Sequence, residues 1–300
     1  MDSPLLSVCL ITYNHAEYIS EAIAGVLMQN VNFSWELIIA DDFSTDGTRE
    51  IILDYQSKHP DFIRLILQKK NVGAAQNWFD LMKYPKSKYI AYFEGDDYWT
   101  DPYKLQKQVD ILEKNSNIVA VVTNASKCDE NGEIIDNIGF DITCNDQTNI
   151  INLNDFFKKS NHYPTPTVMF RNDIDCIIEQ FKYLINPYLG DWILWVLLHT
   201  KGDFFYLDEM TACYRINPKS ITHTVNAINR WKYDFIIREK LKNVIPKEYH
   251  KYLNENWYAY LRIATAYRKQ NKYFSFYLNL FQSFLSNPIK FFKEIYKIKK

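Results

Sequence analysis

The first hundred residues alternate short apolar runs with segments of helical periodicity, and this alternation constrains the fold more than any other feature. The apolar runs predict strands, and the segments between them place apolar residues three or four positions apart, as amphipathic helices do. The predicted strands are Ser7–Tyr13, Glu36–Ala40, Ile63–Gln68 and Tyr89–Phe93, and the predicted helices are Glu17–Gln29, Thr48–Lys58 and Ala74–Lys83. Uninterrupted apolar strands alternating with helices predict an α/β fold whose mainly parallel sheet is covered on both faces.

The second half of the chain is less regular. Further strands are predicted at Ile118–Ser126, Thr165–Arg171 and Phe204–Tyr214, a helix at Leu189–His199, and a loop or hairpin excursion at Asp129–Asn152. From about Asn226 the pattern is helical to the end of the chain. We therefore expect a first, α/β domain over 1–225, with halves 1–100 and 101–225, followed by a C-terminal helical extension over 226–300.

Composition excludes several classes of protein. A formal net charge of −1 gives no general attraction to nucleic acid. The five cysteines are scattered and form no C-x-x-C pair, which argues against a zinc site or a disulfide framework. The start of the chain lacks a basic region before its short apolar run, and no apolar stretch is long enough to cross a membrane. The expectation is a cytoplasmic protein that at most rests on the inner face of the cytoplasmic membrane.

Polar residues gather where the predicted strands end. Thr12-Tyr13-Asn14 follows the first strand, Asp41-Asp42 the second, Asn71 the third, and Glu94-Gly95-Asp96-Asp97 the fourth. In a parallel α/β sheet, ligands bind beyond the carboxyl ends of the strands. These segments are therefore the first candidates for a binding site.

The segment ADDFSTDGT, residues 40–48, allows two interpretations. Asp42, Ser44 and Asp46 followed by Gly47 imitate the start of an EF-hand calcium loop. Such a loop needs a glutamate at its twelfth position, where this chain has Leu53, and a helix rather than a strand before it. The second interpretation is a strand end that turns through helix-capping residues into the next helix. It leaves Asp42 aimed over the sheet edge, where a carboxylate can accept N–H groups of a nucleobase.

The acidic segment EGDD, residues 94–97, indicates a divalent cation site. Hard cations such as Mg²⁺ and Mn²⁺ prefer oxygen ligands, which carboxylates supply. Adjacent side chains of a strand point to opposite faces, so Asp96 and Asp97 converge only if the chain turns, which Gly95 permits. The alternative is a solvated turn before the next helix, but Asp101 and Pro102 already supply a cap there.

Together, SVCLITYN, ELIIADDFSTDGT and YIAYFEGDDYWTDPYKLQKQV resemble family 2 glycosyltransferases of the GT-A fold, over about residues 5–220. The resemblance implies a Rossmann-like mixed, mainly parallel sheet and inverting transfer of a sugar from a nucleoside-diphosphate donor, such as a UDP-sugar. The acceptor would be a hydroxyl group of a glycan or lipid-linked glycan in cell-surface polysaccharide synthesis. The implied cofactor is Mn²⁺ or Mg²⁺.

The resemblance also implies roles for individual residues. Thr12, Tyr13, Asn14, Asp42, Asn71 and Asp96 would bind the donor nucleotide, and Asp97 with Asp96 would bind the metal ion. Asp191, in the segment YLGDWILWV, would be the general base, although aspartate at that point is also an ordinary helix cap. Glu94, Trp192, Arg215 and His223 are candidates for contacts with the diphosphate or acceptor.

Several of these candidates have a second interpretation. Arg215 either binds the diphosphate or forms a structural ion pair, and Trp192 either contacts the acceptor or packs in the core. The family often has arginine in the block that reads NVGAAQNW here, and histidine where this chain has Asn217, so His223 is expected to substitute. Glu94 stands where the family's acidic motif begins with aspartate.

Two further hypotheses remain open. A non-catalytic nucleotide-sugar or carbohydrate-binding module of the same fold would explain the pattern without turnover. The basic apolar segment at 286–300 predicts contact with an anionic membrane, and its alternative is a helix with a solvated basic face.

Overall fold

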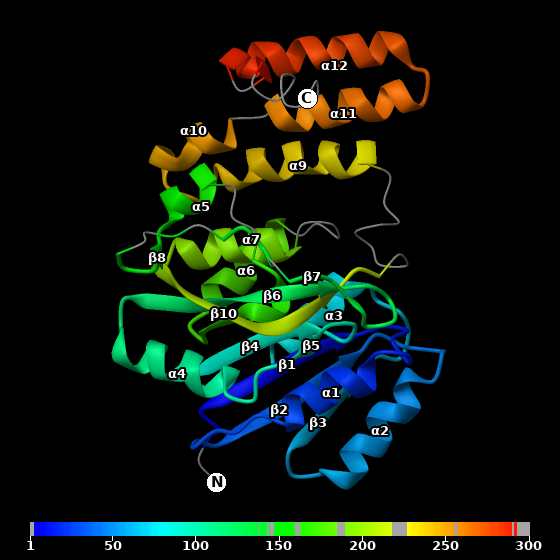
Figure 1. Ribbon diagram of the computed structural model, residues 1–300, viewed down its shortest axis with the longest axis vertical. Coiled ribbons are helices and arrows are strands. Elements are labelled where there is room, and N and C mark those ends of the chain that lie inside the picture. The colour runs from blue at the N-terminus through cyan, green and yellow to red at the C-terminus, as the bar shows by residue number, and fades with distance from the viewer. Residues whose placement is uncertain are drawn as a thin grey trace. The chain divides into compact units, whose positions relative to one another are not determined.

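A computed structural model describes residues 3–137, 139–142, 144, 147–159, 163–184, 190–217, 227–254, 257–289 and 291–292 (Figure 1). The chain divides into two compact units, Met1–Asn217 and Pro218–Lys300. The boundary expected near residue 225 falls in 218–226, outside the described residues.

The first unit alternates strands and helices in the predicted manner. Its strands are β1 Leu6–Thr12, β2 Trp35–Asp41, β3 Ile63–Leu67, β4 Tyr89–Glu94, β5 Tyr98–Trp99, β6 Ile118–Cys128, β7 Ile134–Asp136, β8 Ile150–Ile151, β9 Val168–Arg171 and β10 Asp203–Arg215. Its helices are α1 Ile19–Leu27, α2 Thr48–Lys58, α3 Ala74–Leu81, α4 Lys104–Lys114, α5 Leu153–Lys159, α6 Asp175–Leu184 and α7 Gly190–His199.

These strands form one mixed sheet in the order β3-β2-β1-β4-β9-β6-β10-β5. Strands β1 to β4 pair in parallel, and so do β6 and β10. Strand β9 runs antiparallel to both of its neighbours, β4 and β6. The predicted α/β class with a mixed, mainly parallel sheet is confirmed, and the carboxyl ends of β1, β2 and β4 meet at one edge.

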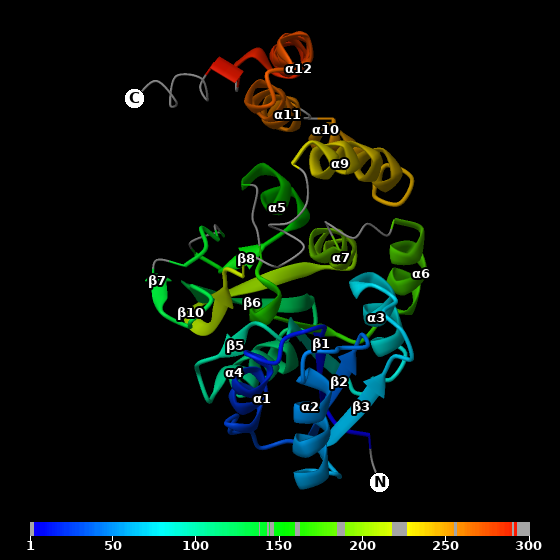
Figure 2. The same ribbon diagram turned by 90° about the vertical axis from the view of Figure 1, so that its right-hand side faces the viewer.

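Helices cover both faces of the sheet, as Figure 2 shows. On one face, Ile23 of α1, Ile52 of α2 and Leu105 of α4 belong to the same buried apolar cluster as alternate residues of β1 and β4. On the other face, Trp78 of α3 contacts Phe181 of α6, with ring centroids 4.8 Å apart. Because both faces are buried, β1 is buried along its whole length, which explains its continuous apolar run.

Helix α6 was not among the predicted elements. Its buried residues are Ile177, Phe181 and Leu184, spaced four and three apart, so the helical signal was present in the sequence. The predicted strand over Thr165–Arg171 begins only at Val168, because Thr165–Thr167 form a 3₁₀ turn after Pro164.

The second unit is helical, as the sequence predicts. It contains α9 Ala227–Leu241, the 3₁₀ turn Lys247–Tyr249, α10 His250–Leu253, α11 Trp257–Lys269 and α12 Tyr273–Ser286. Helix α11 packs against both α9 and α12. Within the described part of the chain, no helix combines the length and apolar character needed to cross a membrane.

His199, at the end of α7, makes the stability of the first unit sensitive to acid. The ring is buried and stacks on the ring of Phe204, with the two centroids 3.8 Å apart. Burial lowers the pKa of His199 to about 3 from an ordinary value of 6.5. The unfolded chain therefore binds this proton more readily between pH 6.5 and 3. The contribution to stability is complete above pH 6.5 and is lost as the pH falls, by about 1.4 kcal/mol per pH unit at most.

We expect His199→Gln to lose less free energy of unfolding than the wild type between pH 7 and pH 5, by about 2 kcal/mol. Urea titrations at the two pH values measure this difference. The comparison concerns the pH dependence and not the absolute stability, so a constant cost of the substitution cancels. Equal losses in both proteins would contradict the assignment.

Candidate active site

Asn14 joins the loops at the ends of β1 and β2 by two hydrogen bonds, one that it donates and one that it accepts. The backbone N–H of Asn14 donates to Oγ of Ser44 at 2.9 Å, and the N–H of Thr45 donates to Oδ1 of Asn14 at 2.9 Å. Asn14 has a positive φ of 54°, which asparagine tolerates better than most residues. Asp46 accepts the N–H groups of Ala16 at 3.0 Å and of Thr48, in the first turn of α2, at 3.0 Å. The turn-and-cap interpretation of this segment thus agrees with the structure.

Asp42 anchors the loop that follows β3. Its Oδ1 accepts the N–H of Val72 at 2.7 Å, and its Oδ2 accepts the N–H of Gly73 at 2.9 Å. Burial raises the pKa of Asp42, and the two backbone donors oppose that shift. Each oxygen of an ionised carboxylate has a second lone pair, so Asp42 can still accept a ligand N–H. Asn71, the residue before this anchored pair, is exposed.

The chain turns at the end of β4. Such a turn is required if Asp96 and Asp97 are to converge on one ligand. The N–H of Asp97 donates to the carbonyl of Glu94 at 3.1 Å. A side chain at Gly95 would place its Cβ 2.9 Å from Oγ1 of Thr12 and 3.1 Å from Nδ1 of His15. Close packing against the end of β1 therefore favours glycine here, in addition to the predicted turn.

The two aspartates of the acidic segment, Asp96 and Asp97, are buried. Asp97 is 2% exposed, and its Oδ1 accepts the backbone N–H of Arg215 at 2.8 Å. Among the described residues, its Oδ2 has no hydrogen-bond partner. Burial first, and then the charges of Asp96 and Asp191, raise the pKa of Glu94 to about 8. Burial and the charge of Asp96 raise the pKa of Asp97 as well. Such a cluster is stabilised by a cation.

Asp191, at the start of α7, lies within electrostatic range of this cluster. Its charge contributes to the raised pKa values of Glu94, Tyr92 and Tyr214. Its Oδ1 accepts the N–H of Trp192 at 2.7 Å, so it also caps its own helix. A carboxylate from α7 and the carboxylates after β4 thus share one region, although about a hundred residues separate them in the sequence.

Arg215, at the end of β10, braces the acidic segment. Its Nε donates to the carbonyl of Asp96 at 2.9 Å, Nη1 to the carbonyls of Asp129 and Glu130 at 3.2 Å, and Nη2 forms an ion pair with Glu21. The guanidinium carbon also lies 4.7 Å from the ring centroid of Tyr18. Because these groups occupy most of its donors, the geometry favours the structural ion pair over a diphosphate contact.

We expect Arg215→Met to lower the free energy of unfolding by about 3–5 kcal/mol, because one buried acceptor and three partly buried acceptors lose their donor. Glu21→Gln is the matched control: it removes only the ion pair, whose carboxylate is half exposed, and should cost under about 1 kcal/mol. Urea denaturation measures both values. A cost for Arg215→Met no larger than that of the control would contradict the bracing role.

The sequence pattern pointed to no partner for His15, but the structure brings it to the acidic segment. Its Nε2 lies 3.8 Å from Oδ2 of Asp96, and its Nδ1 lies 3.3 Å from Oγ1 of Thr12. Its backbone N–H donates to Oγ1 of Thr48 at 2.8 Å. The position of His15, directly after the end of β1, was the available signal, because strand ends of one sheet edge meet.

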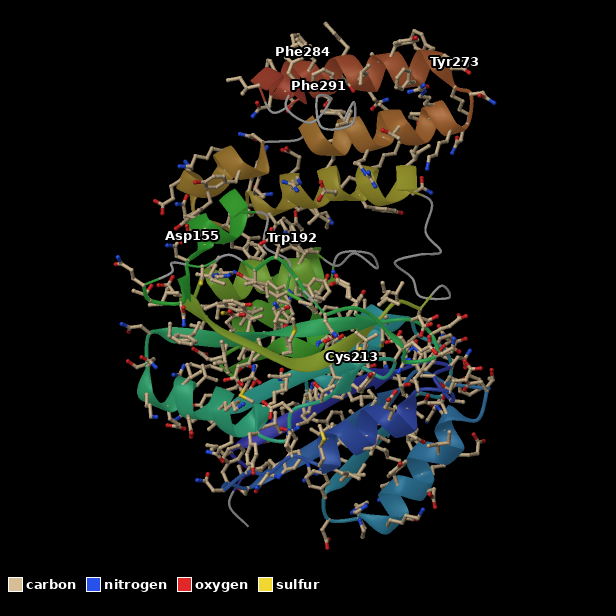
Figure 3. The ribbon with its side chains drawn as sticks, viewed as in Figure 1. Asp155, Trp192, Cys213, Tyr273, Phe284 and Phe291 are labelled. Carbon is tan, nitrogen blue, oxygen red and sulfur yellow. The ribbon has the colours of Figure 1, made fainter. Side chains whose placement is uncertain are left out.

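Three candidates remain, and two of them, Tyr13 and Trp192, are described by the structure. Tyr13, beside Thr12, is exposed. Trp192 contacts the aromatic rings of Phe156 and Phe157, at centroid distances of 6.5 and 6.2 Å, and Figure 3 shows it on α7. His223 lies outside the described residues.

The described residues contain no group of three His, Cys, Asp or Glu side chains arranged to hold a metal ion. The acidic segment nevertheless suits one, because Oδ2 of Asp97 is buried without a partner and Asp96 lies beside it. Mg²⁺ and Mn²⁺ are commonly held by one or two carboxylates together with substrate phosphates. The donor set therefore fits a divalent cation that a diphosphate completes.

Sequence comparison relates the chain to bacterial proteins. It is 46% identical over 110 residues to the uncharacterized protein Rv1520 of Mycobacterium tuberculosis, covering 37% of this chain and 32% of that protein. It is 34% identical over 116 residues to the UDP-Glc:alpha-D-GlcNAc-diphosphoundecaprenol beta-1,3-glucosyltransferase WfgD of Escherichia coli, covering 39% and 44%. The matches thus span less than half the length of these curated relatives.

Structural comparison supports the same fold. The S. aureus TarS 1–349 structure in complex with UDP-GlcNAc is similar with a TM-score of 0.62 and 14% identity, covering 93% of this chain and 91% of that one. The mannosyltransferase PcManGT from Pyrobaculum calidifontis, in complex with GDP-Man and Mn²⁺, gives 0.59 and 15%, covering 94% and 76%. Residues 7–178 match the sequence profile described as Glycosyl transferase family 2. This match covers more than half of the chain, and the chain therefore belongs to glycosyl transferase family 2 and has a GT-A-like fold.

Proposed function

We propose that the chain is a metal-dependent inverting glycosyltransferase. It moves a sugar from a nucleoside-diphosphate donor, a UDP-sugar, to a hydroxyl group of a glycan or lipid-linked glycan in cell-surface polysaccharide synthesis. The observation that carries the proposal is the buried acidic segment after β4, where Oδ2 of Asp97 has no hydrogen-bond partner among the described residues; the charge of Asp191 also raises the pKa of Glu94 in this segment. The relative WfgD, a glucosyltransferase with a UDP-Glc donor and an undecaprenol-linked acceptor, supports the choice of substrates.

The residues of the sheet edge divide into two groups. Asp42, Thr12 and Tyr13, with Asn71 beside them, bind the nucleoside, since Asp42 can accept an N–H of the base and Tyr13 offers an exposed ring. Asp96 and Asp97 hold the cation. Bound Mn²⁺ or Mg²⁺ supplies neutralisation of the charge on the departing diphosphate.

Asp191 acts on the acceptor. It takes the proton of the acceptor hydroxyl while that oxygen forms a bond to the anomeric carbon. The bond between the anomeric carbon and the diphosphate oxygen breaks on the opposite side, and its electron pair leaves with the nucleoside diphosphate. Inversion requires the base and the leaving group on opposite faces of the sugar, which suits a base that comes from α7 and a cation site that comes from the β4–β5 segment.

The test is hydrolysis of UDP-, GDP- and dTDP-sugars by the full chain, with Mn²⁺, Mg²⁺ or EDTA. Release of UDP from one UDP-sugar, dependent on the cation and suppressed by EDTA, is the expected result. Binding of donors without turnover, measured by calorimetry, would favour the non-catalytic binding module instead. Absence of both binding and turnover for every donor would contradict the proposal.

A further inference from the structure

Helix α12, Tyr273–Ser286, exposes a row of large apolar side chains. Phe274 is 83% exposed, Tyr277 64%, Phe281 58% and Leu285 61%. These four residues are spaced three, four and four apart, so they form one stripe along the helix. Ile289 and Phe292, after the end of the helix, are also exposed. An apolar stripe of this size on a helix surface marks an interaction site.

The less exposed side of α12 is the more polar one. Ser275 and Asn279 are half-buried, and Ser283 is fully buried. These three residues recur every four positions, on the side of the helix away from Phe281. An ordinary surface helix buries its apolar stripe and exposes its polar one. In helix α12 the less exposed side is mixed, because Phe276, Leu280 and Phe284 are half-buried there as well, whereas the exposed side is almost entirely apolar (Figure 3, where Tyr273 and Phe284 mark its two ends).

The charge of this part of the chain is uneven. Residues 273–289 contain no charged side chain, whereas Arg268, Lys269 and Lys272 precede them and Lys290 follows. From residue 257 to residue 300 the sequence holds nine Lys and Arg against Glu294 alone. The other 256 residues hold 26 Lys and Arg against 35 Asp and Glu, so the end of the chain is positive on a protein that is otherwise negative.

We infer that the outward face of α12, formed by Phe274, Tyr277, Leu278, Phe281 and Leu285, docks on the surface of an anionic lipid bilayer. Aromatic and leucine side chains enter the boundary of the acyl chains, and cationic groups on both sides of the uncharged segment attract anionic headgroups. The helix has 14 residues, about 21 Å, which is short of the ~30 Å hydrocarbon core, so it lies in the interface and does not cross it.

Charge and composition favour the bilayer over two other occupants. A second copy of this face would bring two strongly positive segments together, which costs energy at ordinary ionic strength. A nucleic acid binds through cationic and hydrogen-bonding side chains, and the exposed stripe has neither. The membrane contact that the sequence predicts for 286–300 lies largely outside the described residues, and the apolar face described here lies before it, on 273–286. This docking is independent of the proposed sugar transfer.

The test compares the full-length wild type with the variant Phe274→Gln/Phe281→Gln/Leu285→Gln, because glutamine favours helix and keeps the charge unchanged. Co-sedimentation is measured with vesicles of phosphatidylcholine alone and of phosphatidylcholine with about 30% phosphatidylglycerol, at about 0.1 M salt. The wild type should partition onto the anionic vesicles at least about 10-fold more strongly than onto the neutral ones. The variant should lose at least about 10-fold of its partition onto anionic vesicles.

Ile134→Gln/Ile135→Gln is the matched control, since it removes two exposed apolar side chains from β7, and it should sediment as the wild type does. Wild-type partition by the α12 variant, or no wild-type binding to anionic vesicles, would overturn the inference. A wild-type dimer that the α12 variant converts to a monomer, without any vesicle binding, would assign the face to a second copy and also overturn it. UDP-sugar hydrolysis, measured in parallel, separates this outcome from the test of sugar transfer, since the α12 variant should hydrolyse donor as the wild type does.

Discussion

Replacing Asp191 with asparagine should lower the rate of sugar transfer by about 10²–10⁴-fold and leave the affinity for the donor nearly unchanged. Asparagine cannot take the proton of an acceptor hydroxyl. It can still accept the N–H of Trp192 through its side-chain oxygen, so α7 keeps its cap. The loss therefore falls on kcat, and isothermal titration with the UDP-sugar and Mn²⁺ measures the donor affinity separately.

Asp175→Asn is the matched control, because Asp175 also lies in the first turn of a helix, α6, and is exposed. It should transfer sugar at the wild-type rate. If Asp191→Asn loses donor binding in proportion to its activity, Asp191 contributes to the donor site and is not the base. If it transfers sugar at the wild-type rate, another group takes the proton.

The first half of the sheet was predicted well from the sequence, because the apolar runs there coincide with strands that are buried. Strands β1, β2 and β4 are buried on both faces, so their apolar runs leave no ambiguity. The second half was harder, because its pairing is not local. Strand β9 enters between β4 and β6 in the antiparallel direction, and β5 has only two residues, Tyr98 and Trp99. A two-residue strand has no period to detect.

The candidate site was partly predictable for the same reason. Strand-end residues were identified from the rule that ligands bind at the carboxyl edge, and Asp191 came from resemblance to the family. The roles of Arg215 and His15 depend on contacts across the fold. Arg215 reaches Glu21, almost two hundred residues earlier, and local periodicity contains no information on such a pair. The positive φ of Asn14 and its hydrogen bonds to the loop after β2 are likewise invisible to local periodicity.

We expect one substitution in the acidic segment, Asp97→Asn, to raise stability and lower activity. Oδ2 of Asp97 is buried without a partner, and burial raises the pKa of Asp97 above its ordinary value. A carboxylate with a raised pKa destabilises the folded state at neutral pH. Asp97→Asn should therefore raise the free energy of unfolding of the metal-free protein, by about 1–3 kcal/mol. The Oδ1 atom of asparagine can still accept the N–H of Arg215.

The same variant should lose the stabilisation that Mn²⁺ and UDP together give the wild type. A ligand that binds only the folded state raises its stability in proportion to the logarithm of its concentration over Kd. Thermal unfolding with and without Mn²⁺ and UDP should show a rise in Tm for the wild type and little rise for Asp97→Asn. Donor turnover should fall by about 10²–10⁴-fold, because neutralisation of the leaving group is worth several kcal/mol.

Asp101→Asn is the control for this experiment. Asp101 lies four residues after Asp97, outside the acidic segment, and its carboxylate accepts the N–H of Tyr103 at 2.9 Å. It should keep both the rise in Tm with Mn²⁺ and UDP and the turnover of donor. Retention of the rise by Asp97→Asn would place the cation elsewhere. A lower stability of metal-free Asp97→Asn would mean that the buried carboxylate is already neutralised within the protein.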